Sequence, residues 1–202
     1  MTTAQRINAR LCRLPTWPIY AAGLLLPFWY LYLGLTGGLG IDPIEALEHK
    51  MGVLALQGLI LGLAVRPLKM WTGVNLIKFR RAVGLITFYF VVCHLLVWLV
   101  LDVQILSQVW ADILKRPYIT VGMVGFVLLV PLALTSNNRS IRKLGPPKWR
   151  RLHQVSYAAA LLGAIHWIML ERGWQLEPLV YLAIIAGLLI ARVPLPMRRA
   201  AA

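Results

Sequence analysis

Three of the chain's four histidines, His94, His153 and His166, fall within or at the edge of long apolar stretches. An ionisable side chain within a membrane segment is costly, so such residues usually face the interior of a helix bundle and serve a function. A neutral imidazole nitrogen is a common axial ligand of haem iron. These histidines are therefore the first candidates for chemistry, and haem ligation is the chemistry that they suggest.

The spacing of the histidines indicates which of them pair. His94 follows Arg81, at the start of one apolar stretch, by the same number of residues as His166 follows His153. Each separation corresponds to about 20 Å of helix at 1.5 Å per residue. If both stretches enter the membrane from the same side, His94 and His166 lie at one depth. We therefore predict that they ligate one haem between them in the core of a helix bundle.

His153 then lies at a second level, and its counterpart in depth is Arg81, preceded by Arg80. Arginine is not an ordinary haem ligand, but it suits a carboxylate such as a haem propionate. We predict that His153 ligates an inner haem with Arg80 and Arg81 at its basic edge, and the second axial ligand stays open. On one straight helix, the side chains of His153 and His166 would point in directions about 140° apart. For both to face the bundle interior, the helix must tilt or contain a π-bulge, or the two residues must bind through different edges of their rings.

Each of these side chains also has a structural alternative. His153 could be an interfacial residue, and His166 could bond a neighbouring helix. His49 lies in an acidic outer loop, and we expect it not to be a ligand, with a role in partner docking or at an outer substrate site left open. Trp98 and Trp167, close in sequence to the paired histidines, are pocket walls or plain packing.

The composition indicates which elements position these residues. Of 202 residues, 59% are hydrophobic and 14% are charged, whereas soluble domains are about 45–50% apolar and about 25% charged. Apolar spans occur at 17–35, 52–65, 82–101, 118–134, 152–170 and 178–191. The second and sixth are short for a crossing helix of about 20 residues, but their flanks can extend them. We expect an all-α integral membrane protein, a bundle of six transmembrane helices.

The charges indicate how this bundle is oriented. Six spans put both termini on one side, together with 17 of the 21 basic residues. The other side holds the four remaining basic residues and all seven acids. By the positive-inside rule, the N- and C-termini are cytoplasmic. The net charge of +14 then reflects topology and contact with anionic headgroups, and we expect no nucleic-acid binding.

The chain divides into a basic cytoplasmic N-terminus (1–16), a six-helix domain (17–192) and a basic cytoplasmic tail (193–202). The N-terminus lacks the pattern of a cleaved signal peptide, so we expect the first span to be retained. Asp42 and Glu45 have the spacing of a capping box for a short interfacial helix in the first outer loop. The absence of an internal repeat weighs against transporters built from repeats.

Other chemistries lack their motifs. The sequence has no nucleophile elbow, no H-E-x-x-H and no glycine-rich nucleotide cradle, so no FMN-binding residue can be assigned. The apolar spans contain no acid that could serve as a proton relay. Without C-x-x-C-H there is no signal for covalent haem, and Cys12 and Cys93 lie in different regions and should not pair.

Five stretches carry a resemblance to a known family. They are "TGGLGIDPIEALEHKMG", "RRAVGLITFYFVVCHLLVW", "KRPYITVGMVG", "LTSNNRSIRKLGPPKWRRLHQVSY" and "IHWIM". With these stretches in this order, the chain resembles the haem-binding membrane subunits of bacterial periplasmic methionine-sulfoxide reductases (MsrQ or YedZ type). The resemblance covers roughly residues 18–192. These subunits belong to the ferric-reductase-like transmembrane superfamily. By this resemblance His94, His153 and His166 match the family's haem ligands. Two-haem relatives place a further histidine where this chain has Arg81.

The resemblance also implies the electron donors and acceptor. Electrons would come from the quinol pool, or through FMN from a soluble cytoplasmic flavin reductase. They would leave to a periplasmic molybdopterin subunit that reduces methionine sulfoxide in oxidised proteins. We therefore expect a b-type cytochrome of the bacterial inner membrane with one or two haem b groups, and FMN by resemblance alone.

The acids of the outer loops are candidates for docking the periplasmic partner by charge complementarity. They are Asp42, Glu45, Glu48, Asp102 and Asp112. The alternative is that they serve topology and solvation alone. Two other functions stay open, a stand-alone metalloreductase that passes electrons to Fe(III) or Cu(II), and a haem-free transporter or assembly factor.

Overall fold

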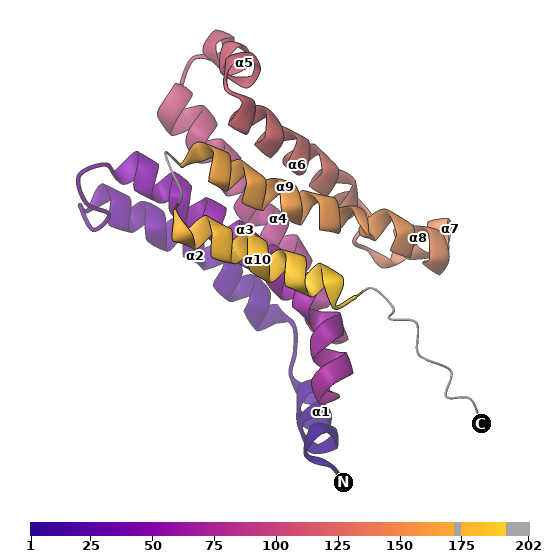
Figure 1. Ribbon diagram of the computed structural model, residues 1–202. Coiled ribbons are helices and arrows are strands. Elements are labelled where there is room, and N and C mark those ends of the chain that lie inside the picture. The colour runs from indigo at the N-terminus through magenta and orange to yellow at the C-terminus, as the bar shows by residue number, and fades with distance from the viewer. Residues whose placement is uncertain (172–174, 193–202) are drawn as a thin grey trace.

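The computed structural model describes residues 1–171 and 175–192, and within these ranges the regular structure is entirely helical. The helices are α1 (Thr3–Arg13), α2 (Trp17–Leu35), α3 (Pro43–Thr72), η1 (Ile77–Phe79), α4 (Arg80–Leu96), η2 (Val97–Val103), α5 (Leu106–Lys115), α6 (Pro117–Leu134), α7 (Asn138–Leu144), α8 (Pro146–His153), α9 (Val155–Leu170) and α10 (Leu176–Ile190) (Figure 1). Arg172 and the predicted tail at 193–202 lie outside the described residues.

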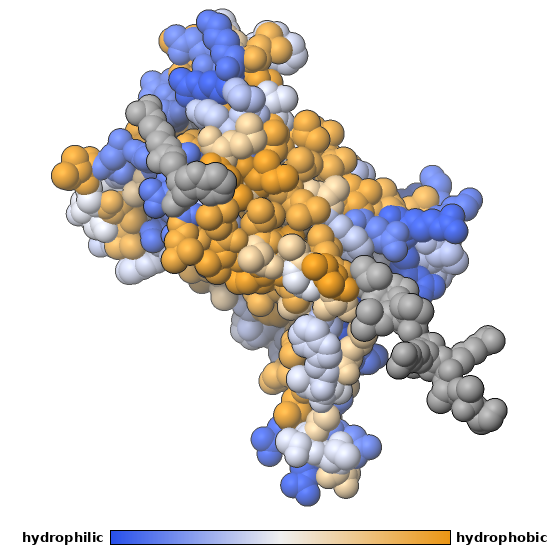
Figure 2. Space-filling model, in the orientation of Figure 1, coloured by the Kyte–Doolittle hydropathy of each residue, from blue (hydrophilic) through white to orange (hydrophobic). Residues whose placement is uncertain are grey.

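Four segments are long and apolar enough to cross a membrane. They are α2, α3, the continuous stretch Ile77–Val103 and α6, and α10 is a shorter apolar helix. Figure 2 shows an apolar belt over the middle of the bundle, with hydrophilic residues gathered towards its ends. Large apolar side chains such as Leu25, Phe28 and Val127 are exposed on this bundle, as expected where lipid is the solvent. The predicted all-helical membrane fold is confirmed, and the protein crosses the membrane several times.

Helix α3 differs from the prediction for the first outer loop. The Asp42 carboxylate accepts a hydrogen bond from the backbone N–H of Glu45 (3.2 Å), and Pro43 occupies the first turn. The helix then continues for 30 residues and ends at Gly73, which has a φ of 74°. The prediction of a separate interfacial helix is wrong, because no residue after Asp42 interrupts the helix before the apolar span.

The helices that carry the histidines pack in pairs. Helix α3 lies along α4, and α6 lies along α9 (Figure 1). Helix α10 joins the two pairs by packing on α9 and α3, where the core contains Leu56, Ala160, Ala164 and Ile185. Small residues such as these alanines allow close approach of helices within a membrane. The two helix pairs therefore face each other, with α4 and α9 each supplying a histidine to the space between them.

The chain around His153 departs from one straight span over 152–170. Helix α8 ends at His153, and α9 begins at Val155. Around the intervening Gln154 the backbone bonds span three residues, from Gln154 N–H to Arg151 O (3.1 Å) and from Tyr157 N–H to Gln154 O (2.9 Å). The prediction of one uninterrupted span is wrong here. A three-residue turn rotates the chain further per residue than an α-helical turn, so the offset of about 140° for one straight helix does not apply unchanged.

Helix α1 is fastened to the connection that follows α3. The Asn8 side chain donates to Gly73 O (2.9 Å) and accepts from the Asn75 backbone N–H (2.8 Å). The Lys78 ammonium donates to Cys12 O (2.7 Å) and to Leu14 O (2.8 Å). Both cysteines are free thiols, as predicted. The basic N-terminal helix is thereby held at the same end of the bundle as Arg80 and Arg81.

Candidate functional site

His94 of α4 and His166 of α9 lie side by side in the bundle. Their ring centroids are 6.2 Å apart and their ring planes are nearly perpendicular, at 83°. Both rings are partly buried. Residues from two separate helix pairs, far apart in sequence, thus meet at one point, as their predicted equal depth requires.

Each ring is held by a backbone carbonyl of the neighbouring helix. His94 Nδ1 lies 2.9 Å from Glu48 O on α3, and His166 Nδ1 lies 2.7 Å from Tyr118 O on α6. A carbonyl oxygen can only accept a hydrogen bond, so Nδ1 carries the proton in both neutral rings. The lone pair is therefore on Nε2 in each histidine, the arrangement in which a neighbouring acceptor fixes a metal-binding imidazole.

This donor set fits a haem iron. Two imidazoles bound to one metal at about 2.0–2.1 Å would have their ring centroids about 6 Å apart, which agrees with the separation of His94 and His166. A structural zinc site would need about four ligands. No cluster of three or more His, Cys, Asp or Glu residues suited to a metal occurs within residues 1–171 and 175–192. Two neutral nitrogens with no further ligand match the axial ligation of haem, whose remaining ligands come from the porphyrin.

Two buried tryptophans lie close to the histidine pair in sequence. Trp98 and Trp167 are both buried, each with 7% of its surface exposed. The His49 ring packs edge-on against Trp167 at a centroid distance of 5.3 Å. The Trp167 indole N–H donates to a carboxylate oxygen of Glu171 (3.2 Å). These contacts bring His49 and the Glu171 carboxylate onto Trp167, the residue that follows His166.

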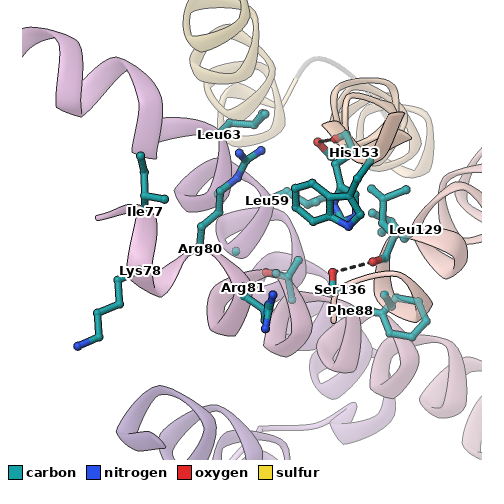
Figure 3. A pocket seen from close by; sticks show the side chains of 18 residues that line it. Leu59, Leu63, Ile77, Lys78, Arg80, Arg81, Phe88, Leu129, Ser136 and His153 are labelled. Carbon is teal, nitrogen blue, oxygen red and sulfur yellow. Dashed lines mark hydrogen bonds between the residues drawn. The ribbon is translucent and has the colours of Figure 1, made fainter. Parts of the chain in front are cut away.

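The predicted inner residues line one cavity of about 360 Å³. Arg80 and Arg81 of α4 and His153 of α8 surround it (Figure 3). Gly62 and Gly84 also line it, and a Cβ added at either would meet nothing within 4 Å. The cavity wall carries no side chain at these two positions. The structure therefore brings together the three residues that the sequence assigned to an inner haem.

His153 is held differently from the outer pair. Its Nε2 lies 3.1 Å from the Thr135 hydroxyl, which donates its own hydrogen to Pro131 O (2.6 Å). Nε2 therefore carries the proton, and the lone pair is on Nδ1. The Trp149 indole stacks on the ring at a centroid distance of 3.8 Å. No second histidine lines the cavity among the described residues, and Arg81 instead donates to the Asn138 side chain (2.7 Å).

Arg192 is a basic residue whose role the sequence did not indicate. It was assigned only to topology, yet it has 8% of its surface exposed. Its guanidinium donates to the Tyr157 hydroxyl (2.8 Å) and to Leu63 O, while its Nε has no hydrogen-bond partner among the described residues. It also lies near enough to Arg80 for their charges to repel. A buried cation with an unused donor suits an anionic group. The available signal in the sequence was that Arg192 directly follows the last apolar span, 178–191.

The family of the chain follows from comparison with known proteins. Residues 51–164 match the family described as ferric reductase like transmembrane component. This segment includes His94 and His153 and ends just before His166. No solved structure matches the chain.

Curated relatives extend the match over nearly the whole chain. Proteins named protein-methionine-sulfoxide reductase heme-binding subunit MsrQ, from Brucella ovis, Brucella canis and Brucella suis, are each 47% identical over 184 residues. The aligned region covers 91% of this chain and 83% of each relative. Together with the paired histidines, these matches show that the chain belongs to the ferric-reductase-like transmembrane family and, within it, to the MsrQ family.

Proposed function

We propose that this protein is the haem-binding membrane subunit of a protein-methionine-sulfoxide reductase and carries electrons across the membrane. The observation that carries the proposal is the facing pair His94 and His166, each with Nδ1 held by a carbonyl and Nε2 free. The names of the MsrQ relatives support it independently. In the proposed topology α9 and α10 cross the membrane with the four longer segments, so residues 17–192 form six crossings with both termini cytoplasmic.

Haem iron, when bound, supplies a one-electron carrier. His94 and His166 would hold it through Nε2, and the buried Trp98 and Trp167 would limit the access of water. The carbonyls of Glu48 and Tyr118 orient the imidazoles and increase the basicity of Nε2 through the Nδ1–H bonds. These residues thus supply rigid, neutral ligands in an apolar setting, which suits electron transfer without chemistry at the iron.

The inner cavity is the proposed site of a second haem. His153 would hold the group through Nδ1, the nitrogen that its bond to Thr135 leaves free, and Arg80 and Arg81 would receive the propionates. Arg192 adds a further cation at this level. An inner group so placed would lie between the cytoplasmic surface and the outer pair, on the path that electrons from that side must take.

The remaining parts of the proposal concern donors, acceptor and membrane. Electrons enter from the quinol pool, or through FMN from a cytoplasmic flavin reductase, and leave to a periplasmic molybdopterin-containing reductase subunit. The membrane is the bacterial inner membrane. Of the predicted docking acids, Asp42 caps α3 and Asp112 pairs with Arg116 at 3.6 Å. Glu45 and Asp102 are exposed and carry no ion pair within the described residues, so they are the better candidates for contact with the partner, whereas Glu48 is half-buried.

The test is haem quantification per chain in the purified protein, combined with reduced-minus-oxidised spectra. We expect a Soret band that shifts on reduction. The variants His94→Ala and His166→Ala should each lose the same spectral component. A colourless protein after expression with ample haem would contradict the proposal, and so would the loss of different components in the two variants.

A second candidate function is a stand-alone metalloreductase, which the name of the matching family favours. Such an enzyme would reduce Fe(III) or Cu(II) at the outer face without a protein partner. Measuring metal reduction by the purified protein in liposomes, with a reductant inside, separates the two functions. Efficient reduction of external Fe(III) in the absence of the periplasmic subunit would favour this alternative.

A further inference from the structure

Two glycines lie directly against the two facing histidines. A Cβ built on Gly122 would lie 2.9 Å from His166 Nδ1 and 3.0 Å from its Cε1. A Cβ built on Gly52 would lie 3.3 Å from both Nδ1 and Cε1 of His94. The first distance is one that real side chains essentially never show, and the second is tighter than most. Glycine is therefore the residue that lets each ring occupy its present position.

Both glycines stand in the same relation to the carbonyl that binds the ring. Gly52 follows Glu48 by four residues, and Gly122 follows Tyr118 by four residues. In an α-helix the carbonyl of a residue accepts the N–H of the residue four positions later. The Cβ of that later residue leans back towards the N-terminus, and thus towards this carbonyl. Without a Cβ, the second lone pair of the carbonyl is open to a donor from another helix.

We propose that Gly52 and Gly122 are positioning residues that expose the Glu48 and Tyr118 carbonyls, so that His94 and His166 both turn Nε2 towards one haem iron. The inference rests on the proposed function and deepens it by naming what fixes the ligands. The same arrangement occurs on α3 for α4 and on α6 for α9, so two independent helix contacts use it. The sequence shows glycines at positions 52 and 122, but only the structure shows that they contact the two histidines.

Another glycine of α6 provides a matched control. A Cβ on Gly125 would meet Leu162 Cβ at 3.7 Å and Ala159 O at 3.9 Å, which are ordinary contacts. Gly125→Ala and Gly122→Ala therefore make the same chemical change on the same helix. Only Gly122→Ala places a methyl group against a histidine ring.

The experiment compares Gly122→Ala, Gly52→Ala and Gly125→Ala in the full-length protein, using haem retention, optical spectra and electron paramagnetic resonance. Loss of a group that orients a metal ligand typically costs about 10–100-fold in metal affinity. We expect Gly122→Ala to weaken retention of the outer haem by at least about tenfold on this basis, and to convert part of it from low-spin to high-spin. Gly52→Ala should have a smaller effect in the same direction, and Gly125→Ala should match the wild type.

A thermal denaturation cycle with His166→Ala tests whether the ring itself is the cause. In that background the methyl group of Gly122→Ala has no ring to displace, so the double variant should melt at the same temperature as His166→Ala. If Gly122→Ala lowers the melting temperature equally in both backgrounds, it acts on helix packing and the inference is overturned. A wild-type low-spin spectrum left unchanged by Gly122→Ala would also overturn it. A wild-type protein without haem would instead contradict the proposed function.

Discussion

The outer and inner levels of the bundle present histidine in two different ways. At the outer level His94 and His166 face each other, and each Nδ1 is bound by a carbonyl. At the inner level His153 uses Nε2 for Thr135 and stacks on Trp149. The outer level carries two facing imidazoles, whereas the inner level is a cavity with one histidine and a basic edge.

This difference indicates that the two levels would bind their groups in different ways. In the proposed function the outer pair would hold its haem through two histidines, so these two residues alone would determine where the iron sits. The inner cavity supplies shape and positive charge, so an occupant there is held mainly through its plane and its anionic groups. We therefore expect substitution of either outer histidine to abolish binding of the outer haem. Substitutions around the inner cavity should weaken binding of the inner haem gradually.

The largest expected effect comes from combining histidine variants. His94→Ala, His166→Ala and the double variant should each lose about one haem per chain, because one missing axial ligand already breaks the pair. Adding His153→Ala should remove a further component independently. Pyridine-haemochrome titration measures these amounts. If the double variant lost two haems while each single variant lost one, the two histidines would not share a group.

The second-largest effect is expected from filling the inner cavity, which tests whether the cavity is a binding site. Gly84 lines the cavity and has nothing within 4 Å of an added Cβ. Gly84→Leu should therefore fold normally and fill the space, which would exclude an inner haem and leave the outer spectrum unchanged. The matched control is Gly187→Leu, which also meets open space but lies on α10 away from the cavity lining. Retention of the full haem content in Gly84→Leu would exclude this cavity as the inner haem site.

Much of this comparison could be predicted from the sequence, and the reasons are physical. Apolar length predicted α2 and α6 with the same bounds or nearly so, because a membrane helix must satisfy its backbone internally. The rise per residue placed His94 and His166 at one depth. The depth of a residue in the membrane depends only on its position along the helix axis. It can therefore be predicted without knowing how the helix is rotated about that axis.

Helix rotation could not be predicted, and it determines the finer features of both sites. A helix that is apolar on all sides has no periodicity to indicate which face points inwards. The bonds from Nδ1 to the Glu48 and Tyr118 carbonyls, and the burial of Arg192, both depend on rotation. The tightened turn at Gln154 could not be predicted either, because the sequence there contains no proline or glycine.

A smaller effect is expected from neutralising the basic edge of the cavity. Arg80→Gln or Arg81→Gln removes one charge-assisted hydrogen bond to an anionic group, which corresponds to about tenfold weaker retention of the inner haem. The reduction potential of the inner component should also fall, since a nearby positive charge favours the reduced state. Redox titration of each variant measures the change. Lys78→Gln is the control, because the Lys78 ammonium turns away to Cys12 O and Leu14 O (Figure 3). An equal fall in all three variants would indicate a general effect of net charge.

The smallest effect concerns the single hydrogen bond that orients His153. Thr135→Val keeps the side-chain volume and removes the acceptor of Nε2–H, while the Trp149 bond to the Thr135 backbone carbonyl (2.8 Å) is retained. The loss of one neutral hydrogen bond is worth about 1 kcal/mol, so the inner haem should stay bound with a modest change in potential and spectrum. The outer component should not change. If Thr135→Val instead removed the inner haem altogether, the orientation of His153 would matter as much as that of the outer pair, and the two levels would be alike in how they hold their ligands.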